Sequence, residues 1–185
     1  VFLVGDHKPY NTVLIVPNLD YRDVDLAAMS PRDLRNYYRS LVVSVNRFLA
    51  PFERIVDFAI VERDFDETRE ELTPKGTYRR KVIAKNFAPV VDALYRRVRL
   101  KSADLGAEIH VPNWLFQALG LTAGDVRWEG GRLVLAPTGA ELTVRRETAG
   151  DDERVLRIGS CRYLVRGRSV DLGARRACPA LWLGN

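Results

Sequence analysis

Residues 71–87 read ELTPKGTYRRKVIAKNF, and this stretch decides how the first half of the chain is interpreted. A turn signal around Pro74 is followed by a burst of positive charge. The stretch stands between an alternating apolar pattern and an apolar pattern of helical spacing, so we expect an exposed loop carried by two packed elements. From Lys75 to Lys101 there are nine Lys or Arg residues and one acid, Asp92. This local excess of positive charge suits a phosphate-bearing ligand.

The composition is typical of a globular protein. The chain has 185 residues, of which 46% are hydrophobic and 29% charged, with a net charge of +5. This length suffices for one ordinary domain or two small ones. No apolar run approaches the roughly 20 residues of a membrane span, and no signal peptide is recognisable, so we expect a cytoplasmic protein. We therefore expect Cys161 and Cys178 to be free, buried thiols.

The two ends suggest a piece of a longer protein. The chain begins without Met on the strand-like Val1, and its last residues include the apolar sequence LWL at 181–183. A natural terminus is usually polar. We therefore expect further residues upstream.

Local signals predict a helix in the first half of the chain. Ser30 is suited to cap it, Pro31 fits its first position, and Asp33 completes a variant of the capping box. Pro51 would end it. Apolar residues at steps of three or four predict one buried stripe, which consists of Leu34, Tyr38, Leu41, Val45 and Phe48.

Strands and a second helix complete the first half. Strands are predicted at 2–4 and 12–16, joined as a hairpin, and at 56–60. A second helix should start near Pro89. Its apolar spacing runs through Ile83, Phe87, Val91, Leu94 and Val98. The order β-β-α-β-loop-α predicts an α+β domain with a small sheet over residues 1–100.

Residues 103–185 are predicted to form a separate, mostly β module. A strand at 108–111 precedes a short helix closed by Gly120, and a hairpin turns at 129–131 between strands at 126–128 and 132–135. Further strands are predicted at 142–145, 155–158, 162–165 and 169–172. The core of this module is expected to contain Trp114, Trp128 and Trp182.

Four ordered segments of the first half resemble a known family. They are GDHKPYNTVLIVPN (5–18), FLAPFERIVDFAIVERDF (48–65), ELTPKGTYRRKVI (71–83) and NFAPVVDALY (86–95). Together they resemble the C-terminal lid domain of AMP-forming acyl-CoA synthetases, particularly the long-chain fatty acid branch, over roughly residues 1–98. The resemblance does not extend to the second module.

The resemblance implies a two-step reaction in a longer polypeptide. In that family an upstream adenylation domain binds ATP, with Mg, and the carboxylic acid, here a fatty acid. The lid closes to form an acyl-adenylate with loss of pyrophosphate, then rotates so that CoA attacks the adenylate. The phosphate-binding loop of the family would lie upstream, so this piece alone is expected to be inactive.

The resemblance also places the catalytic lysine of the lid. Laid without gaps on this sequence, the family's L-T-P-T-x-K loop puts that lysine at Thr77. Lys75 precedes it by two residues, and on an extended backbone positions 75 and 77 share a face. Lys75 is therefore our candidate for the adenylation cation, with a merely solvated lysine as the alternative.

The basic residues after the turn are candidate phosphate ligands. Arg79, Arg80 and Lys81 are expected to contact phosphates of CoA or of the nucleotide. The alternative is a solvated face, in which the three cations pair with Asp64, Asp66, Glu70 or Glu71. Tyr78 is either part of the site or a packing residue of the loop.

Other classes of function stay open. A regulatory or interaction protein could keep the lid fold, with the β module as a docking surface or homodimer interface. Residues 108–135 also resemble swapped-hairpin DNA-binding regulators, but the cations after Arg127 are scattered among acids, so nucleic-acid binding is not expected. His7 and His110 lack metal-ligand spacing, and Ser160 lacks a nucleophile elbow.

Overall fold

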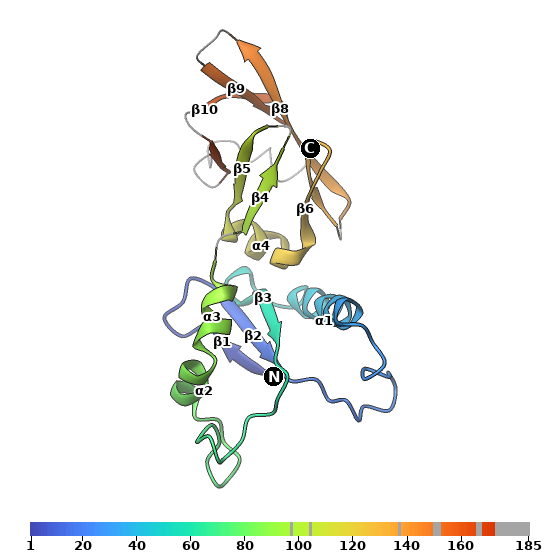
Figure 1. The fold of residues 1–185 in the computed structure, drawn as a ribbon, viewed down its shortest axis with the longest axis vertical. Coiled ribbons are helices and arrows are strands. Elements are labelled where there is room, and N and C mark those ends of the chain that lie inside the picture. Colours follow the sequence, from blue (N-terminus) through green and yellow to red (C-terminus); the bar gives the residue numbers. More distant parts are fainter. Residues whose placement is uncertain (97, 104, 137, 150–152, 166–167, 173–185) are drawn as a thin grey trace. The chain divides into compact units, whose positions relative to one another are not determined.

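The computed structural model describes residues 1–96, 98–103, 105–136, 138–149, 153–165 and 168–172. The chain divides into two compact units, Val1–Arg96 and Arg97–Asn185. Within the described residues, short helices accompany three small sheets, which confirms the predicted α+β class (Figure 1). None of the described helices has the length and apolar character that crossing a membrane requires.

The first unit is built on a three-stranded sheet. Strand β1 (Phe2–Val4) pairs antiparallel with β2 (Asn11–Ile15), which confirms the predicted hairpin. Strand β3 (Ile55–Ile60) lies parallel to β2, which gives the order β1-β2-β3. Helix α1 packs on one face of this sheet, and helices α2 and α3 pack on the other. The central strand β2 is therefore buried on both faces.

Helix α1 (Pro31–Asn46) begins where its capping signals predict. Ser30 Oγ accepts a hydrogen bond from the Asp33 amide at 3.2 Å. The predicted apolar stripe is wrong over most of its length. The side chains exposed there are Leu41, Val45 and Phe48, at 43%, 49% and 90%.

A different row of α1 faces the sheet. Val42 packs against Val13 and Phe58, and the next residue of the row is the buried Asn46. Asn46 Nδ2 donates to the Ile55 carbonyl oxygen at 2.8 Å, and the Ile55 amide donates to Asn46 Oδ1 at 2.9 Å. Because the amide satisfies both backbone groups that open β3, a polar residue occupies a position that periodicity assigns to an apolar one. The 3₁₀ turn η1 (Pro51–Glu53) follows the helix.

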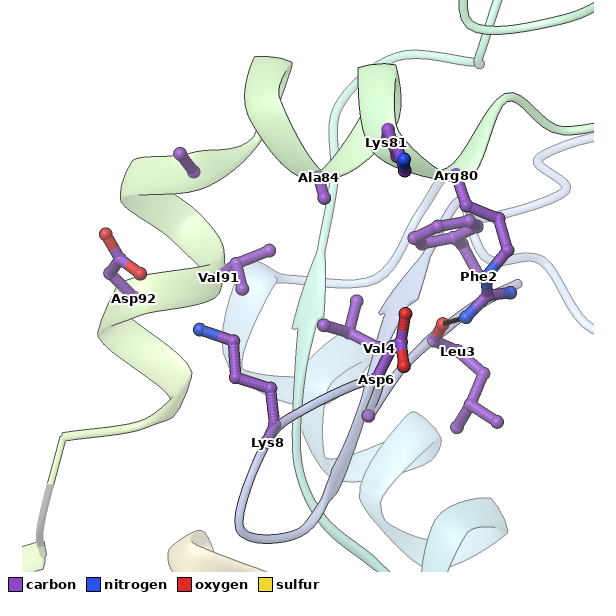
Figure 2. A pocket seen from close by; sticks show the side chains of 12 residues that line it. Phe2, Leu3, Val4, Asp6, Lys8, Arg80, Lys81, Ala84, Val91 and Asp92 are labelled. Atoms are coloured by element: carbon purple, nitrogen blue, oxygen red, sulfur yellow. Dashed lines mark hydrogen bonds between the residues drawn. The ribbon is translucent and has the colours of Figure 1, made fainter.

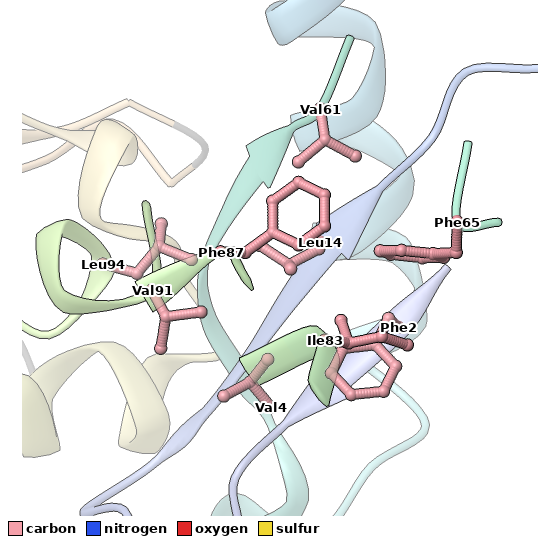
Figure 3. Close-up of a cluster of buried hydrophobic side chains, with 9 residues drawn as sticks. All are labelled: Phe2, Val4, Leu14, Val61, Phe65, Ile83, Phe87, Val91 and Leu94. Carbon is pink, nitrogen blue, oxygen red and sulfur yellow. The ribbon is translucent and has the colours of Figure 1, made fainter. Parts of the chain in front are cut away.

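Two short helices cover the other face. Helix α2 (Arg80–Asn86) and helix α3 (Ala88–Leu94) are separated at Phe87, and Pro89 lies in the first turn of α3 as predicted. Val98 does not continue the helical face but opens a strand in the second unit, where it pairs with Val111. The helices and the sheet enclose the main core of the unit (Figure 3), which comprises Phe2, Val4, Leu14, Val61, Phe65, Ile83, Phe87, Val91 and Leu94.

Two tyrosines tie the end of α3 to the hairpin of β1 and β2. Tyr10 Oη donates to the Leu94 carbonyl oxygen at 2.9 Å. Burial is the main cause that raises the pKa of Tyr10 from 10 to about 12, so this hydroxyl keeps its donor proton to a higher pH than an ordinary tyrosine. Tyr95 Oη lies 3.0 Å from the Val4 carbonyl oxygen. These contacts fix the spacing between α3 and β1.

The second unit contains two sheets. Strands β4 (Val98–Ser102), β5 (Ala107–Val111) and β11 (Ser169–Asp171) form one sheet in the order β11-β5-β4, with β11 parallel to β5. The other is antiparallel in the order β10-β9-β8-β7-β6. Its strands are β6 (Val126–Glu129), β7 (Arg132–Leu135), β8 (Ala140–Ala149), β9 (Glu153–Ile158) and β10 (Cys161–Val165).

The helix and strands predicted for the second unit form, but the residues of its core differ from those predicted. Helix α4 (Asn113–Leu119) ends at Gly120, whose φ of +69° is left-handed, and the turn η2 (Ala123–Asp125) precedes β6. Trp114 and Trp128 are only half-buried, whereas the fully buried side chains include Ile109, Leu115, Phe116, Leu133 and Ile158. Trp182, Cys178 and the side chain of Cys161 lie outside the described residues, so the predictions for them stay predictions.

Candidate functional site

Residues 72–79, which we call the basic hairpin, form a tight turn between two bonded residues. Leu72 and Tyr78 pair as an antiparallel bridge. The Thr73 amide donates to the Thr77 carbonyl oxygen at 2.9 Å, and the Gly76 amide donates to the Thr73 carbonyl oxygen at 2.8 Å. Pro74 suits the first turn position, and Gly76 adopts a left-handed φ of +74° that favours glycine. The turn signal in the sequence is thus confirmed in structural detail.

This geometry corrects the expected placement of Lys75. Lys75 lies within the turn, so residues 75–77 are not extended and the assumption that Lys75 and Thr77 share a strand face is wrong. Thr77 is held in the hairpin by a hydrogen bond from its amide to Thr73 Oγ1, at 3.1 Å. The Lys75 side chain is exposed and has no hydrogen-bond or ion-pair partner among the described residues. The hairpin therefore displays one cation at its tip.

The three basic residues after the turn have different environments. The Arg79 side chain is exposed, without a partner among the described residues. Arg80 Nη2 donates to the Leu3 carbonyl oxygen at 2.7 Å, and its guanidinium lies 4.9 Å from the centre of the Phe2 ring. Lys81 is exposed at the start of α2. Of the three, Arg80 and Lys81 line one cleft, and Arg79 does not.

The ion pairs expected in the alternative interpretation do not form within the described residues. Glu71 pairs with Arg63, and Asp66 pairs with Arg69, rather than with the cations at 79–81. Tyr78 is a packing residue, because its ring meets Phe2 and Phe65 edge to face at 5.7 and 5.5 Å between ring centres. The cations at 75, 79 and 81 consequently remain available to a ligand.

A buried carboxylate lies at the base of the basic hairpin. Glu71 is 0% exposed. Its oxygens accept hydrogen bonds from Arg63 at 2.6 and 2.7 Å, from Asn86 Nδ2 at 2.9 Å and from the Asp66 amide at 3.2 Å. The bonds from Arg63 are the main cause that lowers the Glu71 pKa to about 2, well below its usual 4.5. Sequence reasoning named Glu71 only as a possible surface partner, and the alternating charges of residues 62–71 do not reveal which acid is buried.

A cleft of about 210 Å³ opens between β1 and the helices α2 and α3 (Figure 2). Its apolar wall comes from β1 on one side and from α2 and α3 on the other. Arg80 and Lys81 line it near the start of α2, and Lys8 lines it from the turn after β1. The carboxylates of Asp6 and Asp92 also line it. The cleft can therefore receive a ligand with an apolar body and charged substituents.

Cations on the sheets of the second unit are partly paired, and those exposed without a side-chain partner among the described residues are Lys101, Arg127, Arg145 and Arg146. Arg157 and Arg162 both pair with Glu147, and Arg132 pairs with Glu141 at 2.8 Å. A nucleic-acid surface needs cations free to face phosphates, and the expectation that this unit does not bind nucleic acid stays a prediction. The described residues contain no group of three His, Cys, Asp or Glu side chains placed to hold a metal ion. The two histidines lie in different units.

The fold and the exposed hairpin define a small α+β domain that offers positive charge to an anionic ligand. The model of one protein family, described as AMP-binding enzyme C-terminal domain, matches residues 1–99, which is more than half of the chain. The chain belongs to this family, and its first unit is a C-terminal domain of an adenylate-forming enzyme. Comparison with curated proteins and with solved structures gives no match.

Enzymes of this class use ATP and Mg. The described residues do not fit the metal, because they offer no cluster of ligating side chains. They do fit an anion, because the exposed ammonium of Lys75 and the exposed guanidinium of Arg79 lie in one short hairpin. Among the described residues, Lys75 and Arg79 are therefore the candidate contacts for an anionic ligand.

Proposed function

We propose that the first unit is the lid of an AMP-forming acyl-CoA ligase, acting on a fatty acid bound by an upstream adenylation domain of the same polypeptide. The observation that carries the proposal is the basic hairpin, whose unpartnered Lys75 is displayed on a domain of the AMP-binding family. In the adenylation step the carboxylate of the acid and the α-phosphate of ATP, both anionic, must approach each other. A cation at that point lowers the repulsion and stabilises the charge that moves to pyrophosphate.

Lys75 is the residue we assign to this role. At the tip of a tight turn, its ammonium reaches outward from a rigid base, which suits a lid that must insert a charge into a site on another domain. The same placement lets the lid withdraw the charge when it rotates. Thr77, at the family's lysine position, has no charge to contribute.

The thioester step would use the cations beside the cleft. Arg80 is already oriented by Leu3 and Phe2, so little conformational freedom is lost when it meets a phosphate. With Lys81 it borders an apolar cleft, as a CoA phosphate and its adjoining organic body require. Arg79 stands outside the residues that line the cleft and would contact phosphate at the mouth.

Two observations favour a second candidate function. Thr77 stands where the family resemblance places the lysine, and the exposed apolar side chains of α1 and the turn after it are Leu41, Val45 and Phe48. A non-catalytic regulatory or interaction protein would tolerate the absence of a lysine at position 77. It would use the exposed apolar side chains as a contact surface. In either case we propose a cytoplasmic protein, with the second unit as a docking or homodimer surface.

Carboxylate-dependent exchange of pyrophosphate into ATP tests the proposal. We expect the intact enzyme, with its upstream domain, to catalyse this exchange with a fatty acid and to form acyl-CoA when CoA is added. The 185-residue chain alone should catalyse neither reaction. Absence of exchange by the intact protein across a series of chain lengths would favour the non-catalytic candidate, and exchange by the 185-residue chain would contradict the role of lid.

A further inference from the structure

The side chain of Glu71 connects three separate parts of the first unit. Its carboxylate takes two hydrogen bonds from Arg63 in the segment after β3, one from the Asp66 amide and one from Asn86 at the end of α2. A fully buried charge is tolerated only where such partners replace water. The partners of this one fully buried residue therefore come from two segments, the connection after β3 and helix α2, and Glu71 joins both to the hairpin.

The backbone of the same residue closes the basic hairpin. The Arg79 amide donates to the Glu71 carbonyl oxygen at 2.8 Å, and the Glu71 amide donates to the Asp66 carbonyl oxygen at 3.0 Å. The bridge between Leu72 and Tyr78 follows immediately. Glu71 thus closes the hairpin through Arg79. It also connects the hairpin to the preceding segment through Asp66.

The rest of the hairpin is held mainly by bonds within itself. Those between Thr73 and Thr77, and between Gly76 and Thr73, shape the turn but do not orient it. The attachments besides Glu71 lie at the base of the hairpin: Leu72 packs against the core, Tyr78 packs on Phe2 and Phe65, and the Arg79 carbonyl oxygen accepts from the first turn of α2. Small rotations at the base are therefore enlarged at the tip, where Lys75 lies.

We propose that Glu71 is a positioning residue, which holds the basic hairpin at the angle from which its cations reach an anionic substrate. Arg63 supplies the counter-charge, and Asn86 ties the carboxylate to α2. The inference rests on the proposed function for the identity of the substrate, but the positioning itself concerns only the first unit. Glu71 touches no substrate and acts through the hairpin.

Amide hydrogen exchange on the 185-residue chain tests the positioning without any activity. Glu71→Gln keeps a side chain of similar shape but removes the charge that holds Arg63, and Glu67→Gln is the matched control at an exposed acid of the same segment. We expect the two amides that join the hairpin to its base, those of Glu71 and Arg79, to exchange on the order of tenfold faster in Glu71→Gln, with amides of β2 unchanged. Glu67→Gln should match the unsubstituted chain.

Two results would overturn the inference. One is unchanged exchange of these two amides in folded Glu71→Gln, and the other is equal acceleration throughout the first unit, which would make Glu71 a general stabilising residue. Should Glu71→Gln fail to fold, Asn86→Ala removes one bond to the same carboxylate and must still accelerate the same two amides. If it leaves them unchanged, the positioning role is wrong.

A kinetic arm in the intact enzyme links the positioning to the reaction. Glu71→Gln should lower kcat for adenylate formation on the order of tenfold and leave the KM for ATP within about twofold, because the hairpin is mispositioned but ATP is bound elsewhere. A rise in KM at constant kcat would contradict this link. An intact enzyme with no adenylate formation at all would refute the proposed function, while the exchange experiment would still decide the role of Glu71.

Discussion

At the scale of single residues, Glu71 contributes to folding through its charge. The folded-state pKa is about 2 and the usual value is 4.5, so the ionised carboxylate is favoured in the folded protein. Because the folded pKa is lowered, this stabilisation is complete above pH 4.5 and is lost as the pH falls towards 2. The difference corresponds to about 3 kcal/mol at neutral pH.

We therefore predict that Glu71→Gln loses about 3 kcal/mol of unfolding free energy at pH 7 and about half as much near pH 3. Urea unfolding of the chain and of the variant at both pH values measures the difference, in which the titration of all other carboxylates cancels. A destabilisation of the same size at both pH values would mean that the charge of Glu71 contributes nothing and that only packing was lost.

At the scale of elements, the structure shows which local signals are reliable. Ser30 and Pro31 start α1, Gly120 ends α4, and Pro74 and Gly76 make the turn of the basic hairpin, because in each case the requirement lies within a few residues. These starts, ends and turns could be predicted from the sequence.

Features that depend on distant residues could not be predicted in the same way. The more apolar row of α1 is exposed, and the buried row contains Asn46 because β3 needs its amide. Val98 continues a helical spacing but pairs with β5 instead. The same holds for the candidate site, where the cations were apparent in the sequence but the burial of Glu71 was not.

The orientation of α1 gives a prediction with a matched pair of substitutions. Val42→Ala should cost about 2 kcal/mol of unfolding free energy, since Val42 packs against the sheet and is only 5% exposed. Phe48→Ser should change stability by no more than about 0.5 kcal/mol, since Phe48 is 90% exposed. Thermal or denaturant unfolding measures both. A larger loss of unfolding free energy in Phe48→Ser than in Val42→Ala would contradict this orientation and favour the buried stripe predicted from periodicity.

At the scale of the whole molecule, the chain divides into two compact units. The first unit encloses an apolar cluster of its own residues, and its sheet consists of β1, β2 and β3. We predict that residues 1–96 fold when produced alone. Their circular dichroism and amide exchange should match those of the same residues in the 185-residue chain, whereas an unfolded fragment would show that the first unit depends on the second.

The lid hypothesis assigns the charge of the first reaction step to one exposed side chain at the tip of the basic hairpin. The most direct test is to measure the two half-reactions of the intact enzyme separately after Lys75→Ala, with Lys85→Ala as the control for loss of a nearby exposed cation. We predict that Lys75→Ala slows adenylate formation on the order of 100-fold and leaves thioester formation from preformed adenylate nearly unchanged. Equal, small effects on both half-reactions would contradict the account and remove Lys75 from the mechanism.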